Sequence, residues 1–177
     1  MELIVSDFDI KSHKKYFEVM KKYRDYAIII IEDGIIYTND LIESLYISYT
    51  NYPNCIHARS VSKIMIEKNK VLPYDKWLTN YTFELNPSFY LFAEPEGGIL
   101  FPPNILNISD QNIDEINKCF GANDIYIKYL STKRNIKIKW VPNKFPLGLK
   151  LMKDNITEKI KRNKRYRKRC LNIFPII

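Results

Sequence analysis

One apolar stretch decides the fold: residues Tyr26–Ile31 read YAIIII, and the turn residues Glu32–Gly34 (EDG) follow at once. A short apolar run rich in isoleucine and ended by turn residues predicts a strand that is buried on both faces of a sheet. Its aliphatic part, Ala27–Ile31, is the longest unbroken run of aliphatic residues and is far shorter than the ~20 residues that a membrane-spanning helix needs. The chain therefore predicts a folded protein built around a sheet.

The segments on either side of this strand predict alternating strands and helices. Before it, Leu3–Val5 predicts a short strand, and Ser12 can cap a helix that runs to about Tyr23. After it, Asn39 or Asp40 can cap a second helix that ends near Tyr52, and Glu43 stands at capping-box spacing from Asp40.

The rest of the chain continues the same alternation. The predicted elements are a strand over Cys55–Val61, a hairpin over Met65–Tyr74, a long loop over 78–98, helices over about 110–119 and 123–132, and a strand over Ile136–Val141. Strands alternating with helices predict an α/β fold with a mixed sheet flanked by helices.

Composition narrows the class of protein. A length of 177 residues fits one domain, and three widely spaced cysteines predict reduced thiols in a cytosolic protein. No export signal is visible at the start of the sequence. Two histidines and no closely spaced cysteine pair argue against a zinc site, and no glycine-rich phosphate loop is present.

The positive charge is concentrated at the end of the sequence. Residues 150–177 contain ten basic and two acidic side chains and therefore carry a charge of +8. The whole chain also carries +8, so the remaining residues are neutral in sum. We therefore expect a domain over 1–149 and a basic helical tail over 150–177. The tail could solubilise the protein, dock on anionic lipid or bind nucleic acid. The neutral body carries no nucleic-acid reader motif, so we expect no nucleic acid.

Four groups of residues could carry chemistry. Glu32 and Asp33 end the apolar strand, where two carboxylates could hold a divalent cation, or they could simply form a polar turn with Gly34. Asp124 starts a predicted helix, where it could be a general base or a dipole-favoured residue.

Gly97 and Gly98 could let backbone approach a ligand, or only form a turn. His57 and Arg59 point to the same face of a strand; they could contact phosphate or sugar, but a hydrogen-bonded pair at the edge of the core is the more common arrangement.

Five segments in order resemble a known pattern: Asp9–Tyr16, Ile28–Tyr37, Tyr52–Arg59, Glu96–Pro103 and Ala122–Tyr126. Together they resemble bacterial family-2-like glycosyltransferases with a GT-A-type, Rossmann-like domain, over roughly residues 2–145. The resemblance implies that a sugar is transferred from a nucleotide-sugar donor to a hydroxyl acceptor with inversion, assisted by Mn²⁺ or Mg²⁺.

The resemblance also implies roles for particular residues. Asp124 would deprotonate the acceptor, and Glu32 and Asp33 would bind the metal and the donor. The remaining donor-binding residues would be Lys11, Lys14, Gly97 and Gly98.

Two features depart from the family pattern. Gly34 stands where relatives carry a third acid, which implies weaker metal binding, and Met1 lies almost directly before the Leu3 segment. Relatives carry a further strand-helix-strand unit there, so the chain resembles a truncated enzyme that lacks the N-terminal nucleotide-binding unit.

Two functions follow as expectations. The first is a glycosyltransferase whose activity is weak, lost or dependent on a second chain or homo-oligomer. The alternative is a catalytically silent glycosyltransferase-like scaffold that binds a saccharide or a protein partner. In either case we expect a cytoplasmic protein, held peripherally at the inner membrane face if residues 150–177 bind anionic lipid.

Overall fold

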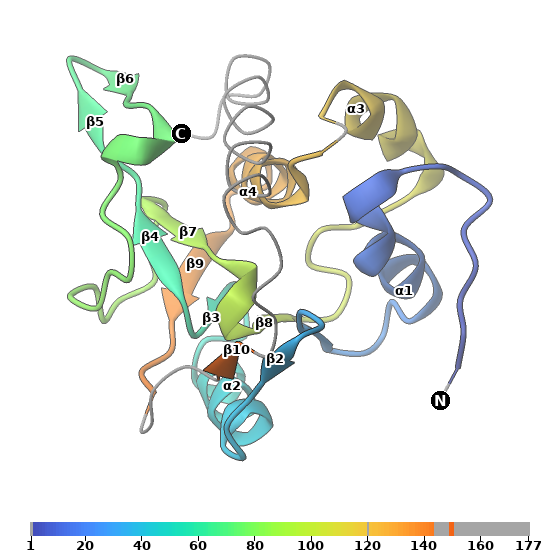
Figure 1. The fold of residues 1–177 in the computed structure, drawn as a ribbon, viewed down its shortest axis with the longest axis horizontal. Coiled ribbons are helices and arrows are strands. Elements are labelled where there is room, and N and C mark those ends of the chain that lie inside the picture. The colour runs from blue at the N-terminus through green and yellow to red at the C-terminus, as the bar shows by residue number, and fades with distance from the viewer. Residues whose placement is uncertain (1, 120, 144–148, 151–177) are drawn as a thin grey trace.

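Strand β1 (Ile28–Ile30) lies at one edge of a four-stranded mixed sheet in the order β1-β8-β3-β9 (Figure 1). The other strands are β8 (Ile99–Phe101), β3 (Cys55–Ala58) and β9 (Lys137–Trp140). Strand β8 runs antiparallel to both β1 and β3, and β9 runs parallel to β3. Consequently β1, β3 and β9 all point the same way. This computed structural model describes residues 2–119, 121–143 and 149–150.

Three two-stranded sheets surround the main sheet. Strand β4 (Val61–Lys63) pairs with β7 (Leu91–Ala93), and β2 (Ile35–Ile36) pairs with β10 (Leu149–Lys150). The hairpin of β5 (Ile66–Glu67) and β6 (Lys70–Val71) projects at one corner of the molecule (Figure 1). Its turn residues Lys68 and Asn69 both have positive φ, 49° and 59°, as a tight hairpin turn requires. The predicted hairpin is confirmed.

The helical segments come in chain order between the strands. They are η1 (Lys11–Lys15), α1 (Phe17–Lys22), α2 (Leu41–Asn51), η2 (Tyr74–Lys76), η3 (Pro95–Gly97), η4 (Asp110–Asn112), α3 (Ile113–Lys118) and α4 (Asn123–Lys133), where η marks a 3₁₀ turn. The predicted helices after residues 40, 110 and 123 are confirmed.

Helices cover both faces of the main sheet. On one face, Ile29 and Leu100 pack with Leu41 and Leu45 of α2. On the other face, Ile28 and Ile30 belong to the large core that includes α1 and α4. The prediction of an α/β fold with a mixed sheet flanked by helices is confirmed. However, β1 is an edge strand, so Ile28 and Ile29 are only partly buried, and burial of the whole strand is a wrong prediction.

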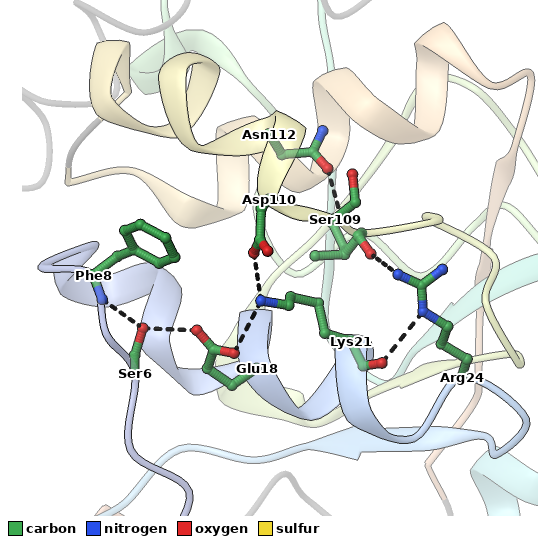
Figure 2. A network of polar contacts seen from close by, with 9 residues as sticks. Ser6, Phe8, Glu18, Lys21, Arg24, Ser109, Asp110 and Asn112 are labelled. Carbon is green, nitrogen blue, oxygen red and sulfur yellow. Dashed lines mark hydrogen bonds and ion pairs between the residues drawn. The ribbon is translucent and has the colours of Figure 1, made fainter.

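A polar network connects the N-terminal segment to α1, and connects α1 to η4 and the residues just before it (Figure 2). Glu18 accepts a hydrogen bond from Ser6 at 2.8 Å and lies 3.4 Å from the Lys21 ammonium. Lys21 also forms an ion pair with Asp110, and Arg24 donates to the Ile108 carbonyl at 3.0 Å. This network holds α1 against the segment that leads into α3.

Several local predictions are wrong. Leu3–Val5 forms no strand, and the helix predicted after Ser12 is divided into η1 and α1. The side chain of Asp40 makes no capping hydrogen bond at the start of α2, because its carboxylate instead accepts from Thr38 and faces Arg59. The segment 78–98, predicted as a loop, contains β7 and η3.

The cysteines differ in state. Cys55 is a buried free thiol, as predicted, whereas Cys119 is bonded in a disulfide, so the prediction of a reduced thiol is wrong there. Cys170 lies outside the described residues, as does the predicted basic tail apart from the backbone of Lys150. Within the described part of the chain, no helix combines the length and apolarity needed to span a membrane.

Candidate functional site

The carboxyl ends of three parallel strands meet at one edge of the main sheet. Glu32 and Asp33 follow β1, Arg59 follows β3, and Asn143 lies shortly after β9. Because β8 runs in the opposite direction, the Gly97-Gly98 pair that precedes it comes to the same edge. In open α/β sheets this edge is where ligands bind. The structure therefore brings four of the predicted donor-side residues, Glu32, Asp33, Gly97 and Gly98, to a single edge.

Lys15 connects the end of β1 to the first turn of α4 in the candidate site. Its ammonium forms an ion pair with Glu32, and both side chains are about three-quarters buried, with 26% and 28% exposed. Lys15 also lines a crevice of about 360 Å³, counting the open space at its mouth. The other lining residues are Ile30, Ala93, Pro95, Ile99, Asn123, Asp124, Ile127, Lys128 and Ile138.

The first turn of α4 forms the opposite wall of this crevice. In the amide orientation that satisfies both polar atoms, Asn123 Oδ1 accepts from Lys15 Nζ at 3.2 Å, and Asn123 Nδ2 donates to Ser12 at 3.3 Å. Asp124, the second residue of α4, is partly exposed, and its Oδ1 accepts from the Ile125 amide at 2.8 Å. Lys15 thus links Glu32, at the end of β1, to the neighbour of Asp124.

His13 holds η1 against the turn before α4. It is fully buried; its Nε2 lies 3.0 Å from the Cys119 carbonyl oxygen and its Nδ1 lies 2.7 Å from the Tyr16 hydroxyl. Burial lowers the pKa of His13 to about 4, although the Cys119 carbonyl and the charge of Asp124 act in the opposite direction. A neutral ring that donates to Cys119 and accepts from Tyr16 satisfies both contacts. His13 therefore positions Lys15 beside α4.

The two lysines expected at the donor side lie elsewhere. Lys11 and Lys14 both pair with Asp9, at exposed positions, and neither lines the crevice. Sequence reasoning missed Lys15, the third lysine of the same segment. The available signal was the three-residue period of a 3₁₀ turn, which places Lys15 on the same side as Ser12, one turn earlier.

The double glycine packs against protein and does not line the crevice. A Cβ on Gly97 would meet the backbone of Ser60, and a Cβ on Gly98 would lie 2.8 Å from Leu41 Cδ1. Gly98 also has φ +83°, a conformation that favours glycine. These glycines bring the start of β8 against the end of β3 and against α2.

The residues at the end of β1 do not match a divalent-cation site as they stand. A divalent cation is bound most strongly by carboxylates whose charge is not compensated, but the charge of Glu32 is already balanced by the Lys15 ammonium. Asp33 is exposed, and Gly34 contributes no side chain. Among the described residues, no group of three or more His, Cys, Asp or Glu side chains gathers where a metal ion could be held.

His57 and Arg59 both find their partners inside the protein, but only His57 is fully hydrogen-bonded. His57 is buried between the Ser48 hydroxyl, 2.9 Å from Nδ1, and the Tyr52 carbonyl, 3.1 Å from Nε2, and burial lowers its pKa to about 4. The Arg59 guanidinium lies 3.3 Å from Asp40 and donates to Thr38 at 3.0 Å. The more common arrangement expected from the sequence, a satisfied pair at the edge of the core, is confirmed for His57, whereas Arg59 keeps one buried nitrogen, Nη2, that faces Asp40 without a hydrogen bond.

Lys128 is a second charged residue that sequence reasoning missed. It is 1% exposed, donates to the Phe89 carbonyl, and lines the crevice one turn after Asp124. Burial lowers its pKa to about 7. A lysine within a helix of mixed polarity carries no sequence signal of burial, so only the packing of α4 against the main sheet reveals it.

Comparison with known proteins adds no relative: neither the protein-family models nor the curated proteins contain a match to this chain.

Proposed function

We propose that this chain is a glycosyltransferase-like protein that transfers a sugar from a nucleotide-sugar donor to a hydroxyl acceptor at the crevice between η1, β1 and α4. The observation that carries the proposal is the position of Lys15, which contacts Glu32 beyond β1 and Asn123 beside Asp124. A cation and a carboxylate therefore share one crevice at the ligand-binding edge of the sheet. The GT-A-type assignment of the fold is part of this proposal.

The proposed reaction assigns one role to Asp124 and one to Lys15, the two charged residues on opposite sides of the crevice. The acceptor oxygen attacks the anomeric carbon while the bond from that carbon to the diphosphate oxygen breaks, with inversion. Asp124 takes the proton of the acceptor hydroxyl as the attack develops. Lys15 stabilises the negative charge on the departing diphosphate.

The alternative function is a silent scaffold that binds saccharide without transferring it. One observation favours it: Lys15 already balances the charge of the Glu32 carboxylate, which weakens this residue as a ligand for the metal that the family resemblance implies. The enclosed part of the crevice is only about 10 Å³, far below the ~300–1,000 Å³ of ligand pockets, so a bound saccharide would lie at its open mouth.

Donor binding and turnover separate these functions. The full-length chain is titrated with UDP- and GDP-sugars in a thermal-shift assay, in which a ligand at 100 times its Kd stabilises by about 2.7 kcal/mol. Release of the nucleotide in the presence of saccharide acceptors then measures turnover. Binding together with turnover supports the transferase, binding alone supports the scaffold, and absence of both contradicts the proposal.

The base assignment is tested by Asp124→Asn, which we expect to lower turnover by about 10²–10⁴-fold while donor binding and thermal stability persist. The matched control is Asp114→Asn, because Asp114 is an exposed aspartate in the first turn of α3. Equal turnover in the Asp124 and Asp114 variants would mean that Asp124 only favours the start of its helix.

The partner proposed for residues 150–177 is an anionic membrane surface that holds the acceptor. These residues lie outside the described structure except for the backbone of Lys150, so the argument rests on their charge of +8. We expect the full chain to sediment with phosphatidylserine vesicles in a salt-sensitive manner. Equal sedimentation after removal of residues 151–177 would contradict this role.

A further inference from the structure

The Lys15 ammonium occupies the position at Glu32 where the family resemblance implies a metal ion. This ammonium forms an ion pair with Glu32 and donates a hydrogen bond to Asn123 Oδ1 at 3.2 Å. The Lys15 side chain also lines the crevice. An ammonium group has three donors. Two of them meet Glu32 and Asn123, which leaves one for a further acceptor.

We propose that Lys15 replaces the divalent cation, binding the diphosphate of the ligand directly, and that Glu32 is a built-in counter-ion that the ligand displaces. This inference rests on the proposed function for its ligand class, a diphosphate. It departs from the metal-assisted reaction implied by the resemblance, and it makes ligand binding independent of Mn²⁺ and Mg²⁺.

The charges favour such an exchange. Glu32 carries one negative charge, whereas a diphosphate carries two or more and offers several acceptor oxygens. Lysine binds phosphate as a compact point charge and needs no fixed bidentate geometry. Asn123 is neutral and 8% exposed, so it stays in place when Glu32 is displaced and continues to hold the Lys15 side chain toward the crevice.

The surrounding structure keeps Lys15 in position without Glu32. His13, two residues earlier in η1, is locked to Cys119 and Tyr16, and Ser12 contacts Asn123. The backbone of η1 is therefore tied to the turn before α4 by contacts that do not involve Glu32. Release of the carboxylate changes one ion pair and leaves this attachment intact.

Inorganic pyrophosphate is the probe that tests the inference. Its affinity for the full-length chain is measured by calorimetry, once in EDTA and once with excess Mn²⁺. Because Mn²⁺ also binds free pyrophosphate, the affinity measured with Mn²⁺ is corrected for the pyrophosphate held by the metal. After this correction we expect the same affinity in both buffers. Binding that appears only with Mn²⁺ would overturn the proposal.

Two variants predict opposite changes. Lys15→Met should weaken pyrophosphate binding about tenfold or more, since a hydrogen bond to a charged group is lost. Glu32→Gln should strengthen it about two- to fivefold, because the competing carboxylate is removed. If Glu32 instead held a metal, Glu32→Gln would weaken binding, so the sign of this change decides between the two arrangements.

Controls separate binding from folding. Lys14→Met removes a neighbouring lysine that pairs with Asp9 outside the crevice, and it should leave the affinity unchanged. Lys15→Arg keeps the charge and should retain binding within a few-fold if Lys15→Met fails to fold. Loss of affinity in Lys14→Met equal to that in Lys15→Met would overturn the assignment to Lys15.

The outcome is independent of sugar transfer. Pyrophosphate binding that resists EDTA and requires Lys15, without transfer of any sugar, would support this inference and contradict the transferase. Transfer that requires both Mn²⁺ and Glu32 would support the transferase and overturn this inference.

Discussion

Gly97 lies so close to Ser60 that a Cβ on Gly97 would stand 2.5 Å from the Ser60 amide nitrogen and 2.7 Å from Ser60 Cβ. The start of β8 can therefore reach the end of β3 only if residue 97 has no side chain. The contact joins the main sheet to the β4–β7 pair, because Ser60 directly precedes β4.

We predict that Gly97→Ala destabilises the fold by about 1–3 kcal/mol, the usual cost of forcing an extra carbon into a packed site. Urea denaturation followed by circular dichroism measures the change. Lys118→Ala, at an exposed position, should change stability by less than about 0.5 kcal/mol. If Gly97→Ala matches Lys118→Ala, the close approach to Ser60 is not present in solution.

The buried histidines predict sensitivity to acid. Burial lowers the pKa of both His13 and His57 to about 4, from an ordinary value of 6.5. Below pH 6.5 the unfolded chain binds protons that the folded chain resists, so stability falls as the pH drops from 6.5 to 4, by about 3 kcal/mol for each ring. Denaturation midpoints measured between pH 7.5 and 4 check this loss.

Replacement of either ring should flatten the acid profile. His13→Gln and His57→Gln each remove one group that titrates in this window, so the variant loses less stability than the wild type between pH 6.5 and 4. Profiles parallel to the wild type would show that folding does not lower the pKa of these rings.

Much of the fold follows from local pattern. The hairpin at Lys68 and Asn69, the α2 face of Leu41 and Leu45, and the helix after residue 123 are each determined by residues close in the sequence. The pairing of β1 with β8 is not determined locally, because β8 comes about 70 residues later and strand pairing has no local signature in the sequence. Alternation also fails at Lys139 in β9, which is buried since its ammonium reaches the Leu85 carbonyl at 2.7 Å.

The candidate site was predictable only in part. Glu32 and Asp124 stand at the ends of recognisable elements, where sheet topology gathers functional groups. The choice between Lys11, Lys14 and Lys15 depends on the turn geometry of η1 and on its contact with Asn123, which is 108 residues away from Lys15. Such a contact is a property of tertiary packing, and no spacing within one segment reveals it.

Lys128 predicts a stability that rises in alkali. Its pKa is about 7 in the folded protein because of burial, against an ordinary value of 10.5. Between these values the unfolded chain binds the proton and the folded chain does not, so stability increases with pH across this window, by roughly 3–5 kcal/mol. Lys128→Met should remove the increase, whereas Lys118→Met, at an exposed position, should retain it. Urea denaturation at pH 7, 8.5 and 10 measures it; an unchanged slope in Lys128→Met would assign the titration elsewhere.

The ion pair of Arg59 with Asp40 predicts the largest effect of a single substitution at the carboxyl edge. The Arg59 side chain is 1% exposed, lies 3.3 Å from Asp40, and donates to Thr38 and Asn143, so it connects the segments after β2, β3 and β9. Arg59→Met leaves the Asp40 carboxylate without its cation and removes the hydrogen bonds to Thr38 and Asn143, so it should lower the free energy of unfolding.

A double-mutant cycle checks that the cost comes from the pair. If the loss reflects the stranded carboxylate, Asp40→Asn added to Arg59→Met should recover part of the stability, and the two single changes should not be additive. Additive losses would mean that Arg59 acts through its contacts with Thr38 and Asn143 rather than through Asp40.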